Sequence, residues 1–159
     1  MTQDTRRHFL ELKIPPPVFA LVTAGLMRLV ARITPGFGFG FPARYLFAIC
    51  FGVTGIVIAV SGFAAFRRAR TTVNPMKLDS SSALVKTGIY KLTRNPMYLG
   101  LFLVLLAWAI LLSNWLTFLF LPFFIFYMNR FQIKPEETAL TSIFGQEFVA
   151  YKARVRRWL

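Results

Sequence analysis

Metal-binding and disulfide-forming residues are almost absent from this chain of 159 residues, which has one cysteine and one histidine. Cys50 lies within an apolar run and has no second cysteine to pair with, so an internal disulfide is excluded. His8 lies in a polar segment with no second histidine and no cysteine beside it, which favours a solvated surface residue. We therefore predict no metal site.

Acidic residues are also scarce: six Asp and Glu stand against 19 Lys and Arg, which gives a formal net charge of +13. Such an excess is compatible with nucleic-acid binding, but here the basic residues lie beside apolar runs instead of covering a polar domain. Membrane proteins concentrate Lys and Arg in their cytoplasmic loops, and this rule explains the pattern more simply. We expect no nucleic-acid partner.

Apolar residues are abundant instead, at 56% of the chain with a mean hydropathy of +0.56. This composition indicates an all-α integral membrane protein that is surrounded by the lipid bilayer. The chain has room for a single membrane domain of several spanning helices, and none for an additional soluble enzyme domain. We divide this domain, 1–159, into N-terminal spans over 1–70 and a C-terminal half over 71–159.

Three apolar stretches predict about four transmembrane helices. The first, 15–34, opens with three prolines that suit a helix start, but it contains two arginines. The second, 45–66, has about the twenty residues that a span needs and no charge. The third, 97–131, is too long for one ordinary span, so we predict a helical hairpin that turns at Ser113-Asn114.

The polar segments indicate the orientation. Segment 67–94 is rich in Lys and Arg and has Asp79 as its one acidic residue, so we place it in the cytoplasm. The basic tail returns to that side, which predicts a multi-pass protein of the inner (plasma) membrane with its catalytic face and both termini cytoplasmic. Residues 136–151 have apolar side chains at helical spacing, so we expect an amphipathic helix packed under the bundle. One feature conflicts with this orientation, because three arginines fall on the side opposite the cytoplasm: Arg28, Arg32 and Arg44. A first segment that re-enters the membrane without crossing it would remove the conflict.

Two polar clusters border the predicted hairpin and form the candidate site. Residues 94–98, Arg-Asn-Pro-Met-Tyr, lie at its entry, and residues 135–137, Pro-Glu-Glu, lie at its exit. A hairpin brings its two ends together, so we expect these clusters to meet at the membrane surface. A purely structural interpretation is also open, because such residues are typical of helix starts and interfacial anchors.

A wider set of motifs resembles a known enzyme family. The motifs are residues 84–90, 94–100, 136–137, 144–145, 151 and 155–158. In their order and spacing they resemble the isoprenylcysteine carboxyl methyltransferase family and the related phospholipid methyltransferases of membranes. The resemblance covers 72–159, about half the chain. It implies a methyltransferase whose catalytic half is 71–159 and whose acceptor is lipid-linked or otherwise membrane-proximal.

The resemblance implies that S-adenosylmethionine is the cofactor. The residues that it assigns to cofactor binding are Ser82, Ala83, Leu84, Val85, Tyr90, Asn95, Pro96, Met97, Tyr98 and Glu136. Several of these suit the ligand, since its sulfonium and ammonium groups attract aromatic faces and a carboxylate. A helix N-terminus near Asn95 offers N–H donors to the carboxylate of the cofactor.

Two positions depart from the family pattern. Asn95 stands where eukaryotic members have His, which keeps a side-chain donor and removes a titratable ring. Gln132 stands where the family has the Arg that binds the acceptor carboxylate, so this positive charge is lost. Arg130, two residues away, can supply this positive charge only where the backbone is not a rigid helix, because side chains two residues apart on a helix point in different directions. We name Gln132, Arg130 and Glu137 as the catalytic candidates.

The group that accepts the methyl stays open between a carboxylate, an amine and a thiol. A carboxylate needs no general base, whereas an amine has to lose a proton, with Glu137 or Tyr98 as the helper. Two other functions also stay open. One is a non-catalytic membrane scaffold of the same fold. The other is a membrane reductase that uses NADPH, for which the missing glycine-rich dinucleotide motif is no obstacle.

Overall fold

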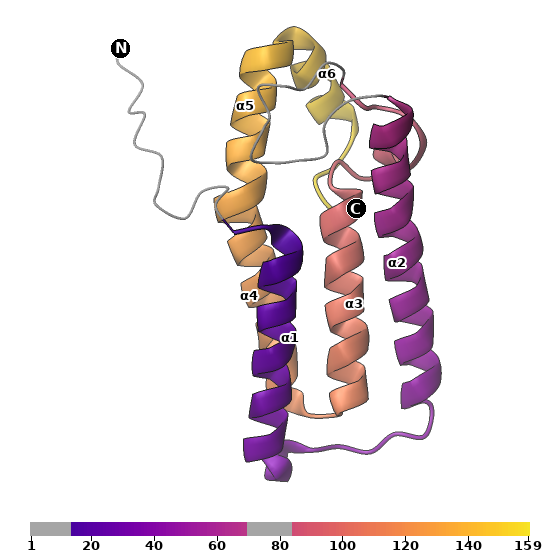
Figure 1. The fold of residues 1–159 in the computed structure, drawn as a ribbon, viewed down its shortest axis with the longest axis vertical. Coiled ribbons are helices and arrows are strands. Elements are labelled where there is room, and N and C mark those ends of the chain that lie inside the picture. The colour runs from indigo at the N-terminus through magenta and orange to yellow at the C-terminus, as the bar shows by residue number, and fades with distance from the viewer. Residues whose placement is uncertain (1–13, 70–83) are drawn as a thin grey trace, which may run out of the picture.

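The computed structural model describes residues 14–69 and 84–159, and within these ranges it consists of helices and connecting turns (Figure 1). The helices are α1 (Pro16–Ile33), η1 (Pro35–Phe37), α2 (Arg44–Arg68), η3 (Gly88–Lys91), α3 (Pro96–Leu112), η4 (Trp115–Leu119), α4 (Phe120–Tyr127), η5 (Met128–Ile133), α5 (Lys134–Phe144) and α6 (Gln146–Arg154). In Figure 1, α3 lies in the middle of a bundle, with α2 on one side and α1 and α4 on the other.

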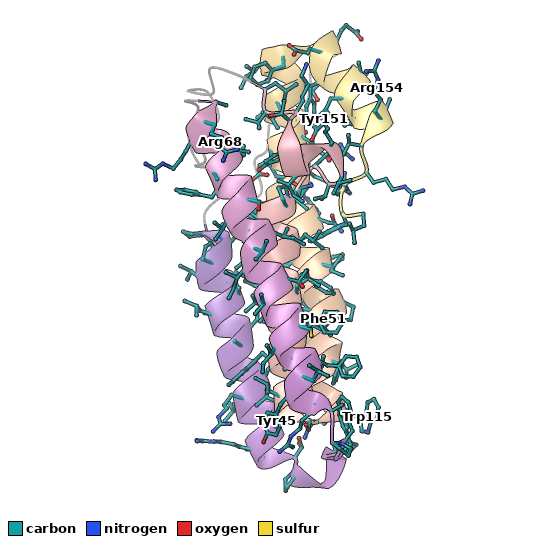
Figure 2. The ribbon with its side chains drawn as sticks, turned by 90° about the vertical axis from the view of Figure 1, so that its right-hand side faces the viewer. Tyr45, Phe51, Arg68, Trp115, Tyr151 and Arg154 are labelled. Carbon is teal, nitrogen blue, oxygen red and sulfur yellow. The ribbon has the colours of Figure 1, made fainter. Side chains whose placement is uncertain are left out.

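The bundle has two ends of different character. We call the end with Arg68, Tyr151 and Arg154 the basic end, and the end with Tyr45 and Trp115 the hairpin end (Figure 2). The basic end carries η3, α5 and α6, and the hairpin end carries the turn between α3 and η4.

Among residues 14–69 and 84–159, three helices are long and apolar enough to cross a membrane: α1 with 18 residues, α2 with 25 and the continuous helix Trp115–Phe144 with 30. Fewer than half of the residues in each apolar window are buried inside the bundle, so most of each window is available to lipid. The prediction of an all-α membrane protein is confirmed. The count of about four spans stays a prediction, because α3 has 17 residues and rises only about 26 Å.

The predicted hairpin turn is confirmed. α3 ends at Leu112, and Ser113 takes the left-handed conformation with a φ of 48°. Asn114 stabilises the turn, since its Oδ1 accepts a hydrogen bond from the Leu116 N–H at 3.0 Å and its Nδ2 donates to the Thr34 carbonyl at 2.8 Å. The turn is therefore also tied to the end of α1.

α2 and α3 approach each other at backbone distance. A Cβ atom added to Gly100 of α3 would lie 2.5 Å from the carbonyl oxygen of Gly55 in α2. One added to Gly62 would lie 2.9 Å from the ring of Pro96. Small residues allow such packing in a membrane, where van der Waals contact between helices replaces the hydrophobic effect. This packing places the start of α3 against the C-terminal part of α2.

α1 covers the other side of α3 and contacts α4. The ring of Phe19 stacks on that of Tyr127 with centroids 3.7 Å apart, and Trp108 donates through Nε1 to the Ala24 carbonyl at 3.0 Å. Met27 is fully buried in the same core. Because α1 is one uninterrupted helix, the re-entrant first segment considered from the sequence is not observed.

The amphipathic helix expected over 136–151 is wrong in both of its boundaries. α5 is a continuation of the preceding helix, which passes through the six-residue π-helix η5 and does not stop before Pro135. At the other end Gly145, with φ 53° and ψ −127°, terminates α5 and starts α6 in a new direction. A positive φ is a conformation that glycine adopts without steric cost, and it commonly ends a helix.

We expect Gly100→Ala to destabilise the bundle, because the added methyl group would overlap the Gly55 carbonyl. Overpacking of this kind lowers the free energy of unfolding by about 1–3 kcal/mol. The measurement is thermal unfolding of the purified chain in detergent. Gly25→Ala is the control, since nothing lies within 4 Å of its added Cβ. Equal melting temperatures for the two variants would contradict the close packing.

Candidate active site

At the basic end, α3 and α5 bring a phenol and a carboxylate into contact. Tyr98 lies in the first turn of α3, and its hydroxyl donates a hydrogen bond to Oε1 of Glu136 in the first turn of α5. Tyr98 is buried and Glu136 is half-buried. The residues are 38 positions apart in the sequence. The predicted meeting of the two clusters at the ends of the hairpin is therefore confirmed.

The neighbouring carboxylate, Glu137, is shared by two arginines. Nη1 of Arg94 lies 2.9 Å from its Oε1, and Nη2 of Arg157 lies 2.7 Å from its Oε2. The Arg157 Nε also donates to Oε1 at 3.1 Å. Burial lowers the pKa of the Arg94 guanidinium from its ordinary value, while the charge of Glu137 acts in the opposite direction. The role of Glu137 as a proton acceptor stays a prediction, and both of its oxygens already bind guanidinium groups.

The tail after α6 returns to the start of α3. Its Arg157 carbonyl accepts hydrogen bonds from Asn95 Nδ2 at 2.9 Å and from Thr93 Oγ1 at 3.2 Å. The N–H of Arg94 donates to the Arg156 carbonyl at 3.0 Å. Asn95 occupies the N-cap position of α3, but its side chain caps no N–H of the helix. Its amide instead holds the tail in place.

η3 adds an aromatic residue to this end of the bundle. Tyr90 is buried, its ring meets that of Phe66 edge to face at 5.5 Å, and its carbonyl accepts a hydrogen bond from the Tyr151 hydroxyl at 2.7 Å. Burial raises the pKa of the Tyr90 phenol above its ordinary value, and the charges of Tyr151 and Glu136 raise it further. Burial likewise raises the pKa of Tyr151 to about 12, with Arg94 opposing the shift.

The other residues assigned to the cofactor are spread around these contacts. Val85 is buried and Leu84 half-buried in the segment before η3. Pro96 and Met97 pack against Gly62 of α2. Ser82 and Ala83 lie outside the described residues. Within the described ranges no group of three or more His, Cys, Asp or Glu is placed to hold a metal ion.

Gln132 and Arg130, the remaining catalytic candidates, lie in the π-helix η5. Gln132 is fully buried, and its Nε2 donates to the Ile14 carbonyl before α1 at 2.9 Å. The Arg130 guanidinium lies over the Phe131 ring at 5.4 Å. The backbone here is not a regular α-helix, and the hydrogen bond of Gln132 ties it to the residue just before α1.

Three residues of this end were missed as site residues. Thr93 and Arg157 hold the start of α3 against the tail, and Trp158 donates through Nε1 to Oδ1 of Asn129 at 3.1 Å. The signal was present, because 155–158 is one of the motifs that carry the family resemblance.

A comparison with protein families decides the relationship. The family model described as phospholipid methyltransferase matches residues 43–147, about two thirds of the chain. The chain belongs to the phospholipid methyltransferase family. The match runs from the start of α2 into α6 and includes both polar clusters. The tail that binds Thr93 and Glu137, and the whole of α1, lie outside it.

Curated proteins resemble parts of this phospholipid methyltransferase family member. An uncharacterized protein of Haemophilus influenzae is 54% identical over 63 residues, which are 40% of this chain and 100% of that protein. The protein-S-isoprenylcysteine O-methyltransferase of Saccharomyces cerevisiae is 39% identical over 82 residues, 50% of this chain and 33% of that protein. The Homo sapiens protein of the same name is 29% identical over 111 residues, 65% of this chain and 39% of that protein.

The motif resemblance to isoprenylcysteine methyltransferases is thereby confirmed at modest identity. The chain spans about two fifths or less of the length of the two named methyltransferases. No solved structure matches it significantly.

We expect Glu137→Gln to destabilise the protein strongly, because it leaves the guanidiniums of Arg94 and Arg157 without their shared carboxylate. Breaking a buried ion pair from one side costs about 3–5 kcal/mol of unfolding free energy. Thermal unfolding in detergent measures the effect. Glu147→Gln removes the same charge from an exposed pair with Lys86 and should cost about 1 kcal/mol or less. If Glu137→Gln lowered the unfolding free energy no more than Glu147→Gln does, the charges of Glu137, Arg94 and Arg157 would not be desolvated.

Proposed function

We propose that this protein is an S-adenosylmethionine-dependent methyltransferase that acts on a lipid-linked or other membrane-proximal acceptor. The observation that carries the proposal is the contact between Tyr98 and Glu136 at the end of the hairpin, within the range that the family match covers. Two relatives that share this range in part are named as methyltransferases that act on protein-S-isoprenylcysteine, which supports the reaction type.

The residues at the basic end fit the charges of this cofactor. Glu136 offers a carboxylate to its ammonium group, and the rings of Tyr90 and Tyr98 offer aromatic faces to a sulfonium. Its carboxylate requires donors, which the first N–H groups of α3 supply. Arg94 adds a further donor, because its Nε is buried and has no hydrogen-bond partner in the described part of the chain.

The proposed chemistry is a direct displacement. When bound, S-adenosylmethionine would supply a methyl group on a positively charged sulfur, which would leave as a neutral thioether when its bond to the methyl carbon breaks. The chain holds the acceptor in line with that methyl group and excludes water, so that alignment and desolvation lower the barrier without a covalent intermediate on the protein. A carboxylate acceptor needs no base, whereas an amine acceptor has to release a proton, for which Glu137 and Tyr98 remain our candidates.

Gln132 bears on the class of acceptor. Its neutral amide supplies no positive charge to hold an acceptor carboxylate, and its donor group is already bonded to Ile14. This position therefore offers no charged partner to an acceptor carboxylate. The apolar helices that surround the site favour a lipophilic acceptor. Mass spectrometry of membrane lipids from cells with and without the protein identifies it by a gain of one methyl group.

We further propose that the basic end faces the cytoplasm of a multi-pass protein in the inner membrane, with 1–159 forming one membrane domain and 71–159 its catalytic half. The support is the density of Lys and Arg at this end, as the positive-inside rule requires. A reporter enzyme fused after Leu159 measures the side on which the C-terminus lies. Activity of a reporter that functions only outside the cytoplasm would contradict this orientation.

We expect Glu136→Gln to weaken S-adenosylmethionine binding about 10- to 100-fold, because a hydrogen bond to a charged group contributes about 1.5–3 kcal/mol. Isothermal titration calorimetry of the purified chain in detergent is the measurement. Glu147→Gln is the control, since it removes the same charge from α6 outside the proposed cofactor site. Thermal unfolding verifies that both variants are folded.

The same calorimetric titration distinguishes the methyltransferase from the reductase and the scaffold. A wild-type chain that binds NADPH and not S-adenosylmethionine would be a reductase, and one that binds neither would be a scaffold. Wild-type affinity in Glu136→Gln would remove Glu136 from the cofactor site while leaving the enzyme class intact.

A further inference from the structure

A cleft lies at the basic end, apart from the contact between Tyr98 and Glu136. It is a cleft of about 440 Å³ between η3 and α6. Its charged lining residues are Lys86, Lys91, Glu147 and Arg154, and Tyr151 forms part of its wall. Figure 2 shows Tyr151 and Arg154 on α6 at this end of the bundle. None of these four charged residues takes part in the proposed cofactor site.

The cleft has more positive charge than its own acidic residue neutralises. Lys86 Nζ lies 2.6 Å from Glu147 Oε1, so this pair is internally compensated. Lys91 and Arg154 have no acidic partner among residues 14–69 and 84–159. Two unpaired cations that line one cavity repel each other, and an anion between them removes that cost. The positive-inside rule explains the number of cations at this end, but not their convergence on one cleft.

We propose that this cleft is a binding site for a phosphate group, either the phosphodiester of an anionic phospholipid or free phosphate. Arg154 offers a planar guanidinium that matches phosphate oxygens in pairs, and Lys91 offers a compact point charge. A volume of about 440 Å³ lies in the range of ordinary small-ligand pockets.

An anion bound in the cleft would affect the proposed cofactor site, because Tyr151 connects the two. The Tyr151 hydroxyl donates to the Tyr90 carbonyl at 2.7 Å, so the wall of the cleft is bonded to η3. An anion bound by Lys91 of η3 and Arg154 of α6 bridges the same two elements from the outside. The bound anion therefore stabilises the docking of α6 on η3, and with it the position of Tyr90.

The test uses the full chain in neutral detergent, with melting temperature followed by intrinsic fluorescence. The probes are inorganic phosphate and the soluble lipid dihexanoyl-phosphatidylglycerol, with sodium chloride at equal ionic strength and dihexanoyl-phosphatidylcholine as references. We expect a saturable rise in melting temperature of about 3 °C, because a ligand that binds only the folded state stabilises it. A rise with phosphatidylglycerol alone assigns the site to a lipid head group, and a rise with both probes shows that free phosphate suffices.

Three variants separate the cleft from the general charge of this end. Lys91→Gln combined with Arg154→Gln should weaken the apparent affinity at least tenfold. Glu147→Gln should strengthen it several-fold, since it removes the one carboxylate and releases Lys86. Lys152→Gln combined with Arg156→Gln removes two exposed charges near the cleft that do not line it, and should leave the affinity unchanged. Equal loss in the two double variants, or no saturable effect beyond chloride, would overturn the proposal.

Discussion

A carboxylate shared by two guanidinium groups holds the basic end of this protein together. Glu137 stands on α5, Arg94 before α3, and Arg157 in the tail after α6, so one group joins three segments that are distant in the sequence. Because Glu137 is almost fully buried, this attraction is screened less than a surface pair would be. The contact between Tyr98 and Glu136 lies one residue away on α5, and its geometry depends on the same anchoring.

The hairpin and the meeting of its ends were predictable because they follow from length and chain connectivity. An apolar run of 35 residues is too long to cross a bilayer once as an ordinary span, and Ser113-Asn114 is the pair of turn-forming polar residues near its middle. The break at Gly145 was not predictable by spacing, since apolar residues continue at helical intervals on both sides of it. There the backbone angle of one glycine overrides the periodicity of its neighbours.

The hydrogen-bond and ion-pair partners of individual side chains were harder to predict from the sequence than the fold. From the sequence, Arg157 belongs to the basic tail and to one of the family motifs, and neither predicts that it bonds to Glu137 through both Nε and Nη2. Gln132 was named from a family position, and its fully buried amide holds the chain just before α1. Since α1 lies outside the family match, that bond joins the matched range to a segment beyond it.

The π-helix η5 sets the angular phase of the carboxylates that follow it. In an α-helix each residue advances the side-chain direction by about 100°, and a π turn accommodates one additional residue. Everything beyond Ile133 is therefore offset by about one such step relative to an uninterrupted helix. If that wide turn became regular α-helix, the side chains of Glu136 and Glu137 would point toward other neighbours. Inserting or deleting one residue within η5 would therefore change the direction of both carboxylates without altering either residue.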